Sequence, residues 1–225
     1  MKALRTVHFP PPIGGLLRTL SKVGFFDRSL LIGSWVMPVY QELYGVRYVL
    51  RTFDVDFAVH LVRQQRKMRA DLERLINDLG FVGFMAAEGV QKFTAKGYEV
   101  EFIAPRAGGR EVGALTVREW NINALPLPFV NILIGFSETV EVDGFTVRIP
   151  IPEAYFVHKL VVAPRRLTIE KREKDLEQCA ALIPILDDER IRRVMQAQRF
   201  SKASKQSIDK SCNAIAFPLQ RLFSW

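Results

Sequence analysis

The stretch LIGSWVMPVYQELYGVRYVLRTFDVDFAV, residues 31–59, places a Gly-Ser turn and an Asp-x-Asp pair on either side of one predicted helix. A short apolar run over residues 28–33 ends at Gly33, and apolar side chains then recur at helical spacing as far as Gly45. Ser34 is the predicted N-cap. Pro38 is tolerated only in a first turn, which would start the helix later than Ser34. The predicted order is strand, turn, helix.

The segment that follows, residues 52–60, alternates apolar and polar residues as a half-buried strand does. Asp54 and Asp56 stand two residues apart, so their carboxylates share one face and repel each other unless a cation lies between them. A hard cation such as Mg²⁺ or Mn²⁺ takes oxygen ligands and keeps open positions for water and phosphates. Gly33 allows close approach of a phosphate, and a helix N-terminus attracts anions. Together the two motifs predict phosphoryl or nucleotidyl transfer.

The rest of the chain predicts an α/β (α+β) fold with a mixed, largely antiparallel sheet, flanking helices and a helical C-terminal part. An amphipathic helix is predicted over 61–79, and strands over 81–105 with a turn at Lys96-Gly97. Asp143-Gly144 between two alternating runs predicts a hairpin. From Pro152 the pattern is helical. The expected division is an N-terminal extension (1–27), an α/β domain (28–151) and a helical region (152–225).

Composition favours a soluble, cytoplasmic protein. Hydrophobic residues make up 48% and charged residues 25% of the chain, which is typical of globular domains. The longest apolar run, residues 129–136, is far shorter than the roughly 20 residues of a membrane helix. Cys179 and Cys212 lack metal-ligand spacing. The net charge of +8 is concentrated near the C-terminus, where it forms either a solvated face or a surface for polyanions.

The quoted motifs resemble the nucleotidyltransferase superfamily of DNA polymerase beta, whose signature is hydrophobic-Gly-Ser, a helix, and Asp-x-Asp on a strand, with a third carboxylate on a later strand. Here the motifs are LIGS and DVDFAV. More narrowly, the chain looks like the bacterial minimal and abortive-infection-type nucleotidyltransferases over about residues 28–183. The further matching residues are Tyr44, Arg51-Thr52, His158-Lys159-Leu160 and Lys174-Asp175-Leu176.

The resemblance implies a role for each matching residue. Gly33 and Ser34 would bind the triphosphate of an NTP substrate. The metal ligands would be Asp54 and Asp56, with Glu101 as the third carboxylate and Glu99 as the alternative to it. Lys159 would neutralise phosphate charge, and Arg51 and Lys174 are further candidates for that role.

The implied reaction moves a nucleoside monophosphate from an NTP to an acceptor hydroxyl with release of pyrophosphate, using Mg²⁺ or Mn²⁺. The acceptor could be a small molecule, RNA or protein. A second hypothesis is a non-catalytic module that binds a nucleotide or a partner, such as one half of a toxin–antitoxin pair. It rests on the basic C-terminal part and on the glutamate at the third-acid position.

Overall fold

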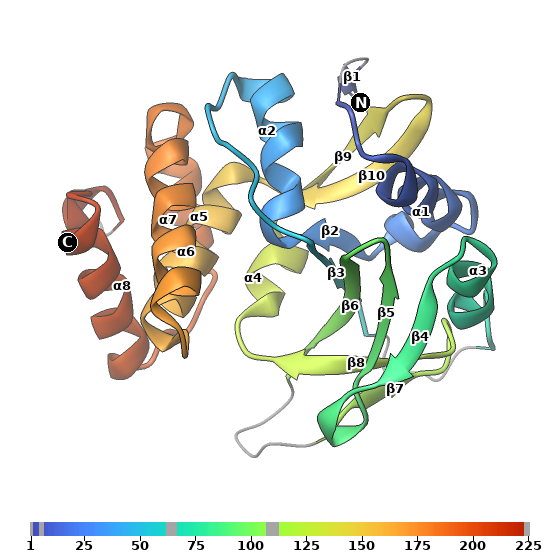
Figure 1. Cartoon of the computed structure of the whole chain (residues 1–225). Coiled ribbons are helices and arrows are strands. Elements are labelled where there is room, and N and C mark those ends of the chain that lie inside the picture. Colours follow the sequence, from blue (N-terminus) through green and yellow to red (C-terminus); the bar gives the residue numbers. More distant parts are fainter. Residues whose placement is uncertain (1, 5–6, 62–66, 107–112, 223–225) are drawn as a thin grey trace.

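A seven-stranded mixed sheet forms the centre of the computed structural model, which describes residues 2–4, 7–61, 67–106 and 113–222 (Figure 1). The strand order is β2-β3-β6-β5-β4, and β8 joins at β6 with β7 beyond it. The β3–β6 and β6–β8 pairs are parallel, and the other pairs are antiparallel. The bounds are β2 (Leu30–Ile32), β3 (Asp54–Ala58), β4 (Val82–Met85), β5 (Gln91–Ala95), β6 (Tyr98–Pro105), β7 (Leu115–Val117) and β8 (Ile122–Leu127). The mixed sheet confirms the predicted fold class.

A smaller sheet holds β1 (Lys2–Leu4), β9 (Ser137–Val142) and β10 (Phe145–Pro150), in the order β1-β9-β10. The hairpin predicted at Asp143-Gly144 is confirmed, because both turn residues have positive φ, 47° and 79°, between the paired strands β9 and β10. Lys96 and Gly97 do the same between β5 and β6, with φ of 50° and 84°. Short turn chemistry was therefore readable from the sequence.

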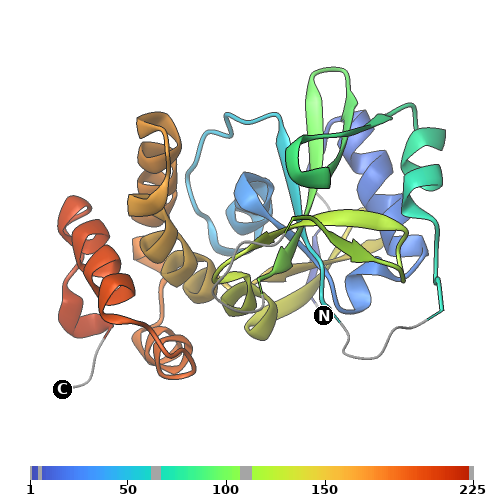
Figure 2. The ribbon, with the colours of Figure 1, turned by 90° about the horizontal axis from the view of Figure 1, so that it is seen from below.

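Helices flank the sheets at both ends of the molecule (Figures 1 and 2). The helices are α1 (Pro11–Lys22), α2 (Met37–Tyr44), α3 (Leu72–Asp78), α4 (Val130–Gly135), α5 (Pro152–Val162), α6 (Ile169–Leu182), α7 (Asp188–Gln196) and α8 (Lys202–Ala214). Single 3₁₀ turns cover Phe25–Asp27, Gly33–Val36, Ala87–Gly89, Ala163–Arg165, Ile183–Ile185 and Leu219–Arg221. Among the described residues, no helix combines the length and the apolarity that crossing a membrane requires.

The helix α5 joins the sheet to the C-terminal helices. It packs against α4, α6, α7 and α8, and its Tyr155 and Phe156 are fully enclosed. On the sheet side, Phe57 of β3 stacks on Phe102 of β6 at 5.5 Å between ring centroids, and Phe25 meets both rings edge-on. These apolar contacts fix the backbone of β3 and β6, which carries the acidic residues. The division into 1–27, 28–151 and 152–225 stays a prediction.

The helix predicted over 61–79 is shorter than expected. It runs only over Leu72–Asp78, and residues 67–71 are irregular, while 62–66 lie outside the described residues. The reason is competition for backbone hydrogen bonds, since the amides of Arg69 and Ala70 donate to the carbonyl of Glu119 instead of continuing a helix. Asp71 then caps α3 by accepting from the amide of Arg74.

Candidate active site

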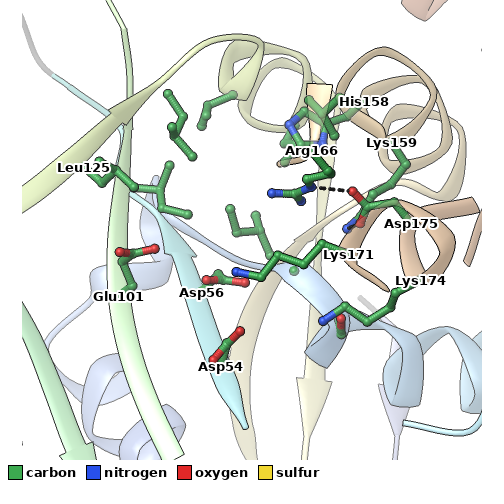
Figure 3. A pocket seen from close by; sticks show the side chains of 18 of the residues that line it. Asp54, Asp56, Glu101, Leu125, His158, Lys159, Arg166, Lys171, Lys174 and Asp175 are labelled. Carbon is green, nitrogen blue, oxygen red and sulfur yellow. Dashed lines mark hydrogen bonds and ion pairs between the residues drawn. The ribbon is translucent and has the colours of Figure 1, made fainter. Parts of the chain in front are cut away.

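A pocket of about 550 Å³ opens between the large sheet and the helices α5 and α6. Its walls differ in chemistry (Figure 3). Most of the carboxylates come from the strands, most of the cations come from the helices together with the carboxylate of Asp175, and an apolar side is formed by β8, α4 and their neighbours. The polar lining residues are Gly33, Ser34, Asp54, Asp56, Lys92, Glu99, Glu101, Tyr155, His158, Lys159, Arg165, Arg166, Lys171, Lys174 and Asp175. Most of the residues predicted from sequence therefore share one cavity.

The acidic wall follows directly from strand register. β3 and β6 are parallel neighbours, with Asp54 opposite Glu99 and Asp56 opposite Glu101. Residues opposite each other on neighbouring strands point to the same face, so the four carboxylates form two adjacent pairs on the pocket side. The structure brings both candidates for the third acid into the pocket.

Gly33 lies directly against Asp56. Its φ is +66°, and a Cβ added there would stand 2.2 Å from Asp56 Oδ2. No side chain fits in that space, and positive φ is itself costly for other residues. Glycine is therefore what allows the turn after β2 to approach the aspartate.

Ser34 is not the N-cap of a helix. The turn Gly33–Val36 is 3₁₀, and α2 begins at Met37. Pro38 therefore lies in the first turn of α2, which agrees with the later helix start that Pro38 indicated in the sequence. The Ser34 hydroxyl instead accepts a hydrogen bond of 2.9 Å from Gln178 Nε2 of α6. This bond ties the turn to the helical part of the molecule.

A buried carboxylate organises the opposite wall. Asp175 of α6 is only 1% exposed and accepts from Lys159 Nζ and, at 2.7 Å, from Arg166 Nε. Burial alone would raise the pKa of Asp175, but Lys159 and Arg166 hold it below its ordinary value. Lys159, which is 4% exposed, also lies over the Tyr155 ring at 5.2 Å.

Two further lysines reach into the pocket from α6. Lys171 and Lys174 stand one helical turn apart, and Figure 3 shows their ammonium groups directed toward Asp56 and Asp54. Burial and then the nearby Lys159 lower the pKa of Lys174. These lysines bring positive charge to the space between the two walls.

The carboxylates impose an electrostatic cost on one another. Burial, then Glu101 and Asp54, raise the pKa of Asp56 to about 6. A bound cation would remove that cost, since it favours the ionised form. On the helical wall, burial and then Lys159 lower the pKa of His158 to about 3, so its imidazole is neutral at pH 7.

Two comparisons with known proteins found matches to this chain. A family model described as nucleotidyltransferase matches residues 12–201. The chain belongs to this nucleotidyltransferase family. A crystal structure of an antigenic nucleotidyltransferase-like protein from Paracoccidioides brasiliensis is similar in fold, with a TM-score of 0.51 over 93% of this chain and 92% of that one, at 14% identity. The search of curated proteins found no match.

The acidic wall of this family member has the donor chemistry that suits a divalent cation. Among the described residues, no three His, Cys, Asp or Glu side chains are already gathered as a metal cluster. The carboxylates of Asp54, Asp56 and Glu101 nevertheless supply hard oxygen donors. Burial and the neighbouring carboxylates raise the pKa of Asp56, and a bound cation would counteract that shift by stabilising the ionised form. Divalent cations would draw these three side chains together from the neighbouring strands β3 and β6.

Not every residue that the sequence predicted for the site lines this pocket. Arg51 is exposed, and it is not among the described residues that line the pocket. Lys159 lines it, but its ammonium is paired with Asp175. Conversely, sequence reasoning gave no role to Arg166, Lys171 or Asp175, although Asp175 stands within the matching Lys-Asp-Leu motif. The spacing of lysines along α6 was the signal available for Lys171.

Proposed function

We propose that this protein transfers a nucleoside monophosphate from an NTP to an acceptor hydroxyl and releases pyrophosphate in a reaction that depends on Mg²⁺ or Mn²⁺. The observation that carries the proposal is the pairing of opposed charges across one pocket. Asp54, Asp56 and Glu101 lie on one wall, and Lys171 and Lys174 lie on the other. Such a pocket suits a divalent cation bound to a triphosphate.

Each wall has its own part in the reaction. Asp54 and Asp56 would hold a first divalent ion, and together with Glu101 as the third oxygen donor they would hold a second one. When bound, one ion would lower the pKa of the acceptor hydroxyl and the other would neutralise charge on the triphosphate. Arg166, a planar donor held at one edge by Asp175, offers its remaining N–H groups to phosphate oxygens.

The turn and the lysines orient the reacting phosphate. Gly33 has no Cβ that would clash with Asp56, so its backbone lies beside the metal-binding carboxylates and can approach the phosphates closely. Lys171 and Lys174 bind the β- and γ-phosphates and stabilise charge on the departing pyrophosphate. The acceptor hydroxyl gives up its proton to water, its oxygen bonds to the α-phosphorus, and the bond from that phosphorus to pyrophosphate breaks in line, so that pyrophosphate leaves with the bonding electrons.

One observation favours a second candidate, the non-catalytic binding module. Lys92 Nζ lies 2.7 Å from Glu99 and 3.3 Å from Glu101, so a side chain already neutralises part of the acidic wall. In that alternative the pocket binds a nucleotide without chemistry, and an RNA or protein partner, including an antitoxin-like one, would use other surfaces. The narrower bacterial and abortive-infection-type resemblance remains part of the proposal.

Pyrophosphate release distinguishes the two candidates. The purified chain is incubated with each of the four NTPs and Mg²⁺ or Mn²⁺, with and without cell-derived RNA and protein. We expect release with at least one NTP, and its loss in the Asp54→Ala/Asp56→Ala double variant. Release that persists in a folded double variant would refute the site. Nucleotide binding by the parent chain without any release would favour the binding module.

A further inference from the structure

Lys92 occupies an unusual place beside the acidic wall. It lies on β5, directly opposite Glu101 in the antiparallel register with β6. Because β6 also pairs with β3, Glu101 stands between Asp56 on one side and Lys92 on the other. The third carboxylate therefore has a negatively charged neighbour, Asp56, on one side and a positively charged neighbour, Lys92, on the other.

The distances show how the lysine is shared. Lys92 Nζ is 2.7 Å from Glu99 Oε1 and 3.3 Å from Glu101 Oε1. The Lys92 side chain is 24% exposed and that of Glu101 is 18% exposed, so both are partly shielded from water. Charge-assisted contacts are stronger in such a setting than on an open surface. Glu99 acts as the closer partner and keeps the ammonium within reach of Glu101.

This contact bears on how cations enter the site. A divalent ion bound to Glu101 would either compete with Lys92 Nζ for the Glu101 Oε1 oxygen or lie so close to the ammonium that the two cations repel each other. Asp54 and Asp56 lie on β3, on the other side of β6 from Lys92, and they have no ion-pair partner among the described residues. One cation position is therefore open, and the other is contested by a side chain.

We propose that the Lys92 ammonium occupies the third-carboxylate site, where Glu99 holds it in place and where it competes with a divalent ion for Glu101. The inference rests on the proposed metal binding at Asp54 and Asp56. It assigns Glu101, and not Glu99, as the acid that receives the second ion. Lys92 is a positioning residue in this scheme, and the second ion binds only when its ammonium moves away from Glu101.

The test counts bound ions without using activity. Mn²⁺ alone is titrated into the full chain, and free Mn²⁺ is measured by electron paramagnetic resonance. We expect one ion to bind tightly to the parent protein. In Lys92→Met, which keeps an unbranched chain without the charge, the second ion should bind about tenfold or more tightly than it does to the parent. Lys92→Arg, which keeps the charge, should behave as the parent.

Two double variants identify the acid that receives the second ion. Lys92→Met/Glu101→Gln should return to one tight ion, whereas Lys92→Met/Glu99→Gln should keep two. The opposite pattern would overturn the assignment of Glu101. Thermal unfolding checks that each variant is folded, and Lys92→Gln repeats the experiment if the methionine variant is not.

The inference can fail separately from the proposed function. If the Asp54→Ala/Asp56→Ala variant binds Mn²⁺ as the parent does, the metal site itself is wrong. If that variant loses the tight ion but Lys92→Met gains none, the proposed metal site stands and the role of Lys92 is refuted. Two equally tight ions in the parent protein would also refute it.

Discussion

Replacing Asp175 with asparagine should destabilise the protein strongly, because it leaves a buried lysine without a counter-ion. The side chains of Lys159 and Asp175 are 5% and 1% exposed, and removing one partner of such a pair costs roughly 3–5 kcal/mol. Arg166 adds less, since its side chain is 35% exposed and water screens it. For a chain of this size the loss corresponds to a fall in Tm of roughly 6–20 °C.

The pH dependence of this effect has a defined sign. Asp175 has a lowered pKa in the folded protein, so its ionised form stabilises the fold at pH values above its unfolded pKa of about 3.9. That contribution is lost as the pH falls through the folded pKa. The difference in Tm between the parent and Asp175→Asn should therefore be full at pH 7 and shrink below about pH 4.

Urea unfolding followed by circular dichroism measures the free energy at pH 7. The matched control is Lys159→Met/Asp175→Asn, which removes both buried charges and should be more stable than Asp175→Asn alone. The reasoning is refuted if Asp175→Asn unfolds within about 1 kcal/mol of the parent, which is the level of an ordinary substitution, or if the double variant is the less stable of the two.

Two further predictions concern the pocket walls. Because the pKa of Asp56 is raised to about 6, its ionisation destabilises the metal-free fold as the pH rises from about 4 to 6. In calorimetry with a chelator, Asp56→Asn should therefore gain stability relative to the parent over that interval. A difference in stability that does not change with pH would contradict this prediction. Lys171→Ala/Lys174→Ala should raise KM for the productive NTP about tenfold or more. The control is Arg172→Ala, on an exposed face of the same helix, which should change KM less than about twofold. Equal effects of the two variants would show that the pocket lysines do not contact the triphosphate.

The acidic wall was predictable from sequence because it depends on local rules. Side chains alternate along a strand, so Asp54 and Asp56 had to share a face, and the same holds for Glu99 and Glu101. What the sequence could not supply was the pairing of β3 with β6, which are separated by a helix and two strands. Register between distant strands is set by packing of the core, here the stacked Phe57 and Phe102.

The cationic wall was harder to predict because its residues depend on tertiary contacts. Lys159 was expected to contact phosphate, yet its ammonium is paired with Asp175. A one-dimensional pattern does not show which of several lysines finds a buried counter-ion. The same applies to Ser34, whose local sequence predicts a cap but whose hydroxyl bonds to Gln178, 144 residues away. Local propensity gives way when a distant partner satisfies the group.

The arrangement of charge in the pocket constrains how its ligands bind. Carboxylates repel a free triphosphate, and the lysines opposite them repel a free divalent cation. In the proposed site, a metal–triphosphate complex would meet both walls with the favourable sign, with its cation toward Asp54 and Asp56 and its phosphates toward Lys171 and Lys174. The two ligands should therefore bind cooperatively, each raising the affinity of the other by the same factor. This reciprocity follows from the opposed walls and does not depend on which base or acceptor the protein selects.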